Sequence, residues 1–181
     1  MAVESSVDTI DRLPDVTLPD LDGTAVELVA LAAGRPLVVA FACNHCPYVR
    51  WVESGLGSLA GRRKDAAWVA ICSNDVVAYP DDDVPGLREQ AERASWGFPY
   101  LVDSTQQVAR TFGAVCTPDF FVFDASGRLV YRGAMDDARP NMEPIVDGKY
   151  LEMAIDAAKA GGVIAGLGRP SLGCGIKWRP E

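Results

Sequence analysis

Two continuous apolar segments constrain the fold of this chain more than any other feature. Leu37–Phe41 and Ala67–Cys72 contain only apolar residues, which is typical of strands that are buried on both faces of a sheet. Between them, apolar residues recur at helical spacing over residues 49–59, after Pro47, a residue suited to a first helical turn. Strand, helix and strand in this order predict a βαβ unit with a right-handed crossover.

The remaining segments extend this unit into an α/β fold with a mixed central sheet flanked by helices. We expect a β-hairpin at residues 16–28, around Asp22-Gly23, as an N-terminal extension. Asp103 or Ser104 would cap a helix that stops at Gly113, with Gln107 completing a capping box. The other expected elements are helices at residues 85–96 and 150–160 and strands at residues 100–102, 120–123 and 129–132.

Charge and chain length exclude several classes of protein. The chain of 181 residues carries a net charge of −8, which argues against nucleic acid and against an anionic membrane surface as partners. The length is that of one ordinary domain. Residues 36–43 form the longest apolar run and are too few to span a bilayer. The first residues lack the pattern of a secretory signal, so we expect a cytoplasmic protein whose cysteines are reduced.

The motif Cys43-Asn-His-Cys46 lies where the first buried strand ends and the helix begins. Its spacing lets the two sulfurs form a disulfide with little backbone movement. The helix N-terminus favours a thiolate at Cys43, and His45, the single histidine of the chain, is a second candidate to stabilise it. A CxxC pair in a βαβ context indicates redox chemistry. The alternative is a metal site, for which this motif supplies fewer than the usual four ligands.

Polar residues follow the second buried strand at the same edge of the sheet. Asn74 and Asp75 come shortly after Cys72, the last residue of that strand. Because the carboxyl ends of parallel strands meet at one edge, we expect Asp75 to lie near Cys43. The acidic runs at residues 81–83 and 136–137 are interpreted as solvated loop charges.

Five short motifs follow one another in an order that is informative as a set: Cys43-Asn-His-Cys-Pro-Tyr-Val49, Ile71-Cys-Ser-Asn-Asp75, Phe98-Pro-Tyr-Leu101, Cys116-Thr-Pro-Asp-Phe-Phe121 and Gly173-Cys-Gly-Ile-Lys-Trp178. With them, the chain resembles the AhpC/TSA redoxin family, in the peroxiredoxin-like branch that carries a thioredoxin-type CxxC motif. The resemblance runs from about Leu18 to Trp178 and implies a thioredoxin-like fold. With the N-terminal β-hairpin extension, we expect residues 1–181 to form one domain. An N-terminal arm at residues 1–14 and a C-terminal tail at residues 163–181 would flank it.

The resemblance also implies roles for individual residues. Cys43 would be the attacking thiolate, and Cys46 would resolve the mixed disulfide. Pro118 would be a cis-proline facing the cysteine pair, and Thr117 would offer backbone groups to an extended substrate segment. Trp51 would line a substrate surface, although core packing or simple surface exposure explains this residue as well.

The chain departs from its relatives at several positions. The strand Leu37–Phe41 lacks the buried aspartate of thioredoxins, so the proton acceptor for Cys46 is either Asp75 or water. Aligning the peroxidatic cysteine of peroxiredoxins with Cys46 puts Cys43 at their threonine and Pro118 at their arginine. The groups that activate peroxide are therefore largely missing, and direct peroxidase activity, with Cys46 as peroxidatic thiol and Cys43 resolving, becomes the alternative.

The other three cysteines have different expected roles. Cys72 lies in a buried strand and is interpreted as an inert core thiol. Cys116, two residues before the expected cis-proline, is either a small packing residue or a third redox thiol. Cys174 would either fold back as an additional resolving cysteine or pack beside Trp178, and we favour packing.

The sequence therefore predicts a thiol–disulfide oxidoreductase. Its substrate would be a disulfide-containing protein or a small thiol compound, and a dithiol would supply the electrons. We expect no cofactor and no resident metal. The alternatives are a thiol-dependent peroxidase with antioxidant function, a protein that holds a soft metal such as Cu(I) through the cysteine pair, and a noncatalytic interaction domain.

Overall fold

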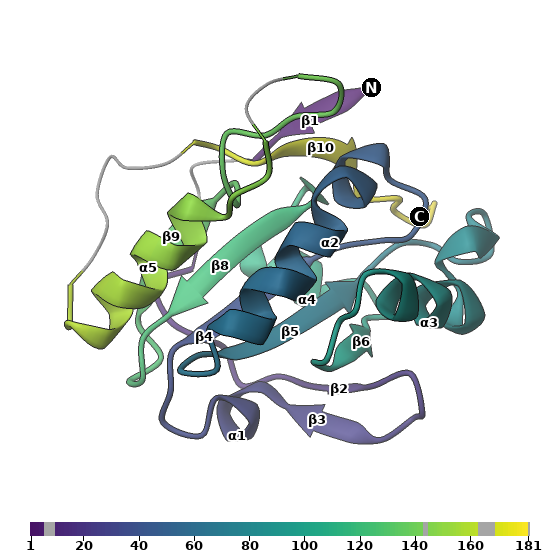
Figure 1. Ribbon diagram of the computed structural model, residues 1–181. Coiled ribbons are helices and arrows are strands. Elements are labelled where there is room, and N and C mark those ends of the chain that lie inside the picture. The colour runs from purple at the N-terminus through teal and green to yellow at the C-terminus, as the bar shows by residue number, and fades with distance from the viewer. Residues whose placement is uncertain (6–9, 143–144, 163–168, 181) are drawn as a thin grey trace.

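A five-stranded mixed sheet lies at the centre of the computed structural model, which describes residues 1–5, 10–142, 145–162 and 169–180 (Figure 1). The strand order is β6-β5-β4-β8-β9. The parallel strands are β4 (Leu37–Phe41), β5 (Ala67–Cys72) and β6 (Tyr100–Val102). The antiparallel strands are β8 (Asp119–Phe123) and β9 (Leu129–Gly133). The two apolar segments that the sequence singled out are thus neighbouring parallel strands.

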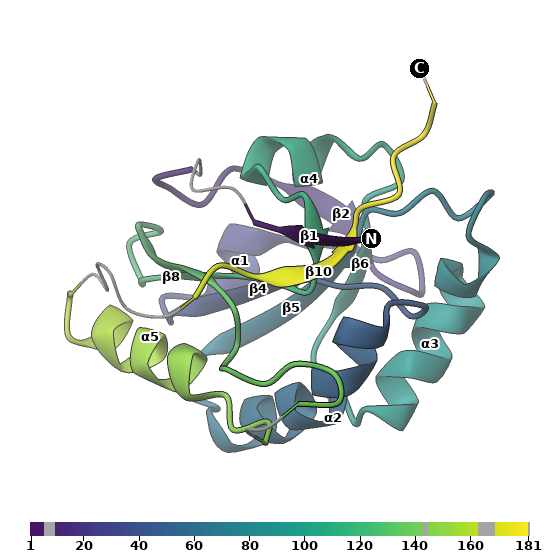
Figure 2. The same ribbon diagram turned by 90° about the horizontal axis from the view of Figure 1, so that it is seen from above.

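Helices cover both faces of this sheet, which is why every residue of β4 is buried. Val38 and Ala40 belong to a core shared with α2 (Pro47–Arg62), α3 (Val84–Arg93) and α5 (Lys149–Lys159). The alternate side chains of β4 belong to a second core with α1 (Leu28–Ala32) and α4 (Gln107–Phe112), on the opposite face (Figure 2). Burial on both faces removes the alternation of apolar and polar residues that one-sided strands show.

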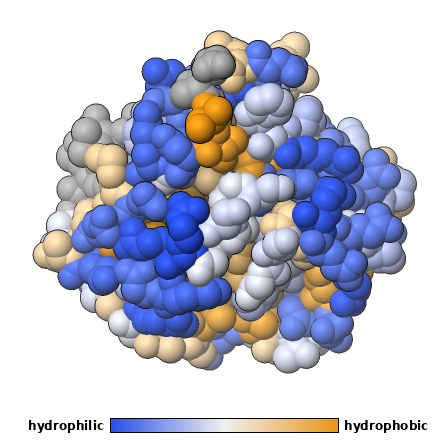
Figure 3. All heavy atoms as spheres, in the orientation of Figure 1, coloured by the Kyte–Doolittle hydropathy of each residue, from blue (hydrophilic) through white to orange (hydrophobic). Residues whose placement is uncertain are grey.

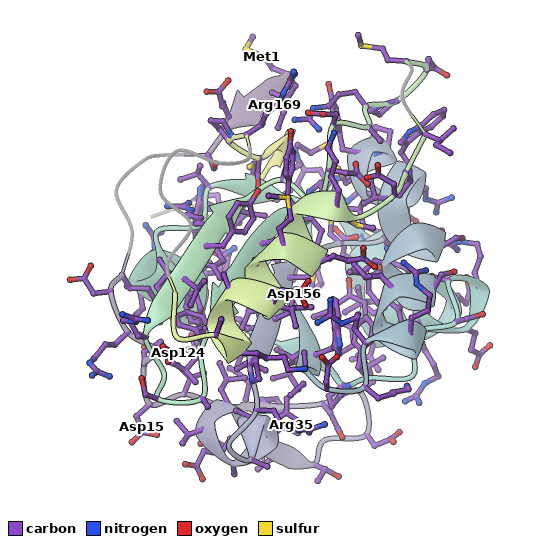
Figure 4. All side chains as sticks on the ribbon, turned by 60° about the vertical axis from the view of Figure 1, so that its left-hand side comes forward. Met1, Asp15, Arg35, Asp124, Asp156 and Arg169 are labelled. Atoms are coloured by element: carbon purple, nitrogen blue, oxygen red, sulfur yellow. The ribbon has the colours of Figure 1, made fainter. Side chains whose placement is uncertain are left out.

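Two small sheets complete the fold. The expected N-terminal hairpin is confirmed as β2 (Thr17–Pro19) paired with β3 (Ala25–Glu27). The other sheet joins β1 (Ala2–Glu4), β10 (Leu172–Gly175) and β7 (Cys116–Thr117) in the order β1-β10-β7. Met1 and Arg169 accordingly lie at the same end of the molecule (Figure 4). The segments expected to form an arm and a tail therefore contribute paired strands.

Several local predictions were wrong, and hydrogen bonds explain why. The residue before α4 is Gln106, in a left-handed conformation and without a side-chain cap. Asp103 instead accepts from Ser73 Oγ and from the Ala109 backbone N–H. The helix expected at residues 85–96 ends at residue 93, and a 3-10 turn, Pro80–Asp82, precedes it.

The acidic runs were expected to be solvated, but each contains one buried carboxylate. Asp82 and Asp136 are 0% and 1% exposed, and Asp83 caps α3 by accepting from the Gly86 N–H. Asp136 accepts hydrogen bonds from the backbone N–H groups of residues 138, 147 and 148. Backbone donors replace water around these carboxylates, which makes their burial favourable.

Within the described ranges, no helix is long and apolar enough to cross a membrane.

Candidate active site

The sulfurs of the CxxC motif meet at Thr117. Cys43 follows β4, and Cys46 is the residue that precedes the first turn of α2. Cys43 Sγ lies 3.3 Å from Thr117 Oγ1, and Cys46 in its thiol form donates to the Thr117 carbonyl oxygen at 3.2 Å. The Thr117–Pro118 peptide bond is cis, as the resemblance implied. Both cysteines are reduced and 0% exposed, so the arrangement is a buried dithiol beside a cis-proline.

The negative charge of this dithiol falls on Cys46. Hydrogen bonds from the Cys43 thiol, from Cys174 and from the Val49 backbone N–H lower the pKa of Cys46 to about 5, although burial opposes this. Donating to Cys46 raises the pKa of Cys43 well above its ordinary value, and burial and the charge of Asp82 act in the same direction. The opposite directions of these two pKa shifts favour ionisation of Cys46 over ionisation of Cys43. The sequence had placed the thiolate on Cys43, because the helix was expected to act on the first cysteine.

His45 is bonded to Asp82. Its Nδ1 lies 2.6 Å from Asp82 Oδ2, and the ring stacks on Tyr79 with centroids 5.3 Å apart. The hydrogen bond with Asp82 raises the pKa of His45, so the imidazolium form is favoured. Cys43 Sγ is within 4.8 Å of both groups, and the carboxylate charge raises the pKa of that cysteine. The expected stabilisation of a Cys43 thiolate by His45 is thus opposed by the partner of His45.

Asp82 organises the backbone of the CxxC loop. Its Oδ1 accepts from the N–H groups of Asn44 and His45 at 2.7 and 3.1 Å, and its Oδ2 also accepts from Asn74 Nδ2 at 2.8 Å. Burial alone would raise the pKa of Asp82, but the bonds from His45 and Asn74 hold it below its ordinary value. Sequence reasoning missed this residue. The signal that was available is the set of unpaired N–H groups ahead of a helix, which need an acceptor.

A second group of buried polar residues supports the loop from the side of α3. Gln90 Nε2 donates to the Cys43 carbonyl at 3.0 Å and to Glu53 Oε2 at 3.1 Å. Arg93 bonds Glu53 at 2.7 Å and Asn44 Oδ1 at 2.9 Å. These contacts fix the main chain around Cys43 between α2 and α3. They join helices that are distant in sequence, and no local pattern indicated them.

The side chains of Asn74 and Asp75, both expected at this edge, make contacts with different parts of the structure. Asn74 reaches the site through Asp82 and also accepts from the Lys177 N–H at 2.9 Å. The Asp75 carboxylate accepts from the Val77 N–H at 3.2 Å and pairs with Arg179 at 3.6 Å. Asp75 thus anchors the C-terminal segment, and its role as proton acceptor stays a prediction.

The edge of β7, which was expected to receive a substrate segment, is occupied by β10. Cys174 lies opposite Thr117 and Gly175 lies opposite Cys116 in an antiparallel pair. Cys116 is fully buried, and burial raises its pKa well above the ordinary value. Burial also raises the pKa of Cys72 to about 12. Both thiols therefore have the properties of packing residues.

An apolar hollow lies beside the first turns of α2. Trp51, Met142 and Ile145 contribute to its lining and are 40%, 64% and 79% exposed. Figure 3 shows a mainly hydrophilic face that is interrupted by a strongly apolar patch in its upper part. Trp51 is thus a surface residue near the cysteine pair, and its contact with substrate stays a prediction.

One group of described residues has the spacing of a metal site. Ligand atoms of Cys43, His45 and Asp82 lie within 4.8 Å of one another. Each oxygen of Asp82, however, already accepts two hydrogen bonds. The donor set therefore fits a hydrogen-bonded ion pair better than it fits metal coordination.

Comparison with known proteins supports the fold and the family. An uncharacterized conserved protein from Geobacillus kaustophilus is 39% identical, with a TM-score of 0.93 over 100% of this chain and 98% of that chain. A hypothetical protein from Sinorhizobium meliloti 1021 is also 39% identical, with a TM-score of 0.92 over 98% of each chain. A putative thioredoxin from Neisseria meningitidis, 20% identical, has a TM-score of 0.63 over 84% of this chain and 92% of that chain.

These similarities confirm the thioredoxin-like fold that the sequence predicted. No match was found among curated proteins. The AhpC/TSA family model matches residues 10–132, more than half of the chain. The chain belongs to the AhpC/TSA family.

Proposed function

We propose that this protein is a thiol–disulfide oxidoreductase whose redox pair is Cys43 and Cys46. The observation that carries the proposal is the buried pair of sulfurs beside the cis Thr117–Pro118 bond, with Cys43 Sγ 3.3 Å from Thr117 Oγ1 and Cys46 Sγ 3.2 Å from the Thr117 carbonyl oxygen. Membership in a redoxin family supports oxidoreductase chemistry in general. A thiolate is the nucleophile of disulfide exchange, and a neighbouring thiol completes the exchange.

In the proposed reaction, the Cys46 thiolate attacks one sulfur of a substrate disulfide and displaces the other as a thiolate. Cys43 then attacks the Cys46 sulfur in the mixed disulfide. Its proton passes to the leaving substrate thiolate, and the Cys43–Cys46 disulfide closes. The substrate gains two electrons as a dithiol, and an external dithiol returns them to the protein. The roles are the reverse of those expected from the sequence, because Cys46 carries the charge.

The burial of the two sulfurs limits how a substrate can reach them. Both sulfurs are fully buried under β10, so attack on a protein disulfide or a small disulfide requires β10 to move from Thr117. Trp51 and the apolar hollow beside it would then contact a protein substrate. The reaction needs no cofactor, and the cytoplasmic location stays a prediction.

Reduction of insulin disulfides with dithiothreitol as electron donor tests this function. Cys46→Ser and Cys43→Ser should each abolish turnover, whereas Cys72→Ser, a buried thiol outside the site, should retain it. Full turnover by Cys46→Ser or by Cys43→Ser would refute the proposed function.

Peroxide reduction is the second candidate, and one observation favours it. Cys46 precedes Pro47 at the start of a helix and has a pKa lowered to about 5, as a peroxidatic cysteine requires. Stopped-flow mixing of the fully reduced protein with hydrogen peroxide separates the two functions. A rate no higher than that of free cysteine dismisses the peroxidase.

A further inference from the structure

The CxxC pair is cut off from external thiols in this conformation. Cys43 and Cys46 are 0% exposed, whereas Cys174 is partly exposed. A dithiol that returns electrons to the protein must reach a sulfur to form the mixed disulfide. Among the described cysteines at this edge, Cys174 is the one that is partly exposed as a residue.

Strand pairing puts Cys174 next to the redox pair. Cys174 lies directly opposite Thr117 in the β7–β10 ladder, and side chains of directly opposed residues share one face of the sheet at about 5 Å between Cβ atoms. That face is the one on which Thr117 Oγ1 contacts Cys43 Sγ at 3.3 Å. Cys174 also packs against the buried cluster that contains Cys43 and Cys46, and its thiol and backbone N–H lower the pKa of Cys46. Three sulfurs thus converge on one threonine.

We propose that Cys174 is a third catalytic thiol, which exchanges with the Cys43–Cys46 disulfide and receives the reducing dithiol at the protein surface. The proposal rests on the proposed function of the Cys43–Cys46 pair. The Cys174 thiolate attacks Cys46 Sγ, the Cys43–Cys46 bond breaks, and Cys43 leaves as a thiolate that takes up the proton released by Cys174. A thiolate of the external dithiol then attacks Cys174 Sγ and displaces the Cys46 thiolate. The second thiol of the external dithiol releases Cys174, so two electrons enter the protein and the external dithiol becomes a disulfide.

The charges of the site favour this order of events. In the reduced protein, burial and the adjacent Cys46 thiolate raise the pKa of Cys174 to about 12. Once Cys46 is in a disulfide, it no longer carries the negative charge that raises the pKa of Cys174, and Cys174 ionises more readily. Lys177 already lowers the pKa of Cys174. Burial raises the pKa of Cys174 in both states, but the contribution of the Cys46 charge is present only in the reduced state. Oxidation of the pair therefore makes Cys174 a better nucleophile for the proposed exchange.

Leaving-group strength directs the external attack as well. In a Cys46–Cys174 disulfide, the sulfur with the lower pKa leaves faster, and Cys46 is that sulfur. Attack at Cys174 releases Cys46, whereas attack at Cys46 would require entry into the buried site. Accessibility and leaving-group strength therefore select the same sulfur atom.

A trapping experiment tests the contact directly. In a Cys43→Ser variant, oxidation with one equivalent of diamide should join Cys46 to Cys174 within one chain. Acid quenching, alkylation and peptide mass spectrometry would detect the linked peptides. Recovery of Cys174 as the alkylated free thiol, while Cys46 is oxidised or linked to a second molecule, would overturn the proposal. This measurement uses an intact C-terminal strand and does not depend on how a Cys174 variant folds.

Kinetics of re-reduction test the role. The oxidised protein is mixed with dithiothreitol, and return of the two thiols is followed by quenched alkylation. Cys174→Ser should slow this step about tenfold or more, since the dithiol must then attack a buried sulfur, and Cys72→Ser should match wild type. An unchanged rate of re-reduction in Cys174→Ser refutes the proposed role of Cys174. Failure of wild type to form the Cys43–Cys46 disulfide would instead refute the proposed function, so the two failures are distinguishable.

Discussion

Replacing Gly173 with alanine would separate β10 from the cysteine pair. A Cβ atom at this position would lie 1.8 Å from the Thr117 carbonyl oxygen and 2.6 Å from the Thr117 carbonyl carbon. Both partners are backbone atoms and cannot rotate away. The strand must therefore move by more than an ångström, which disturbs the pairing of Cys174 with Thr117. Gly173→Ala thus exposes the site without changing any sulfur atom.

The size of the effect follows from the cost of overpacking. Inserting a methyl group into a closely packed position costs about 1–3 kcal/mol. If this cost falls on the docked state of β10, the undocked population rises by about 5–150-fold. Reaction of a buried group that opens and closes rapidly is proportional to this population. The alkylation rate of Cys46 at neutral pH should therefore rise by a factor in that range.

Iodoacetamide labelling with mass spectrometry of the Cys46 peptide measures this rate. Gly175→Ala, on the same strand as Gly173, is the matched control, because its Cβ would lie 3.3 Å from the flexible Val3 Cγ2 atom of β1. Thermal unfolding of both variants separates local opening from global loss of stability. Equal Cys46 labelling in Gly173→Ala and wild type would refute the argument that β10 controls access.

Three other measurements test the hydrogen bonds of the site. The ultraviolet absorbance of the Cys46 thiolate should be lost as the pH falls through about 5. In Cys43→Ala this absorbance should be lost at a higher pH, because the Cys43 thiol that stabilises the thiolate is gone. A wild-type midpoint of about 8.5, the ordinary pKa of cysteine, contradicts this prediction. The NMR signal of His45 should titrate above its ordinary pKa and shift down in Asp82→Asn. The His45–Asp82 pair then stabilises the folded state fully below the ordinary pKa of histidine, and this stabilisation is lost as the pH rises through the raised pKa of His45. Identical His45 titrations in wild type and Asp82→Asn contradict this prediction. Gln90→Leu should lower the free energy of unfolding by about 1–3 kcal/mol in urea titrations, because the buried Cys43 carbonyl loses its donor; an unchanged midpoint would count against this role.

Local sequence signals were sufficient for part of the site. Cys43 and Cys46 were recognisable as a candidate redox pair because CxxC spacing places two sulfurs across one helical turn. The cis-proline at Pro118 was implied by the resemblance to the redoxin family. The burial of Asp82 was not recognisable. A run of three aspartates is typical of a solvated loop. Asp82 is buried because the N–H groups of Asn44 and His45, which are distant in sequence, donate hydrogen bonds to its carboxylate.

The sequence by itself determined the central strands, because a short continuous apolar run that helices cover on both faces has few alternatives to a buried strand. It also indicated Cys43 and Cys46 as the candidate redox pair. Only the tertiary structure decided which of them carries the charge, since the pKa of Cys46 depends on donors from Cys43, Val49 and Cys174. Cys174 reaches the site through a strand of four residues, two of them glycines, whose pairing comes from distant partners and not from its own composition.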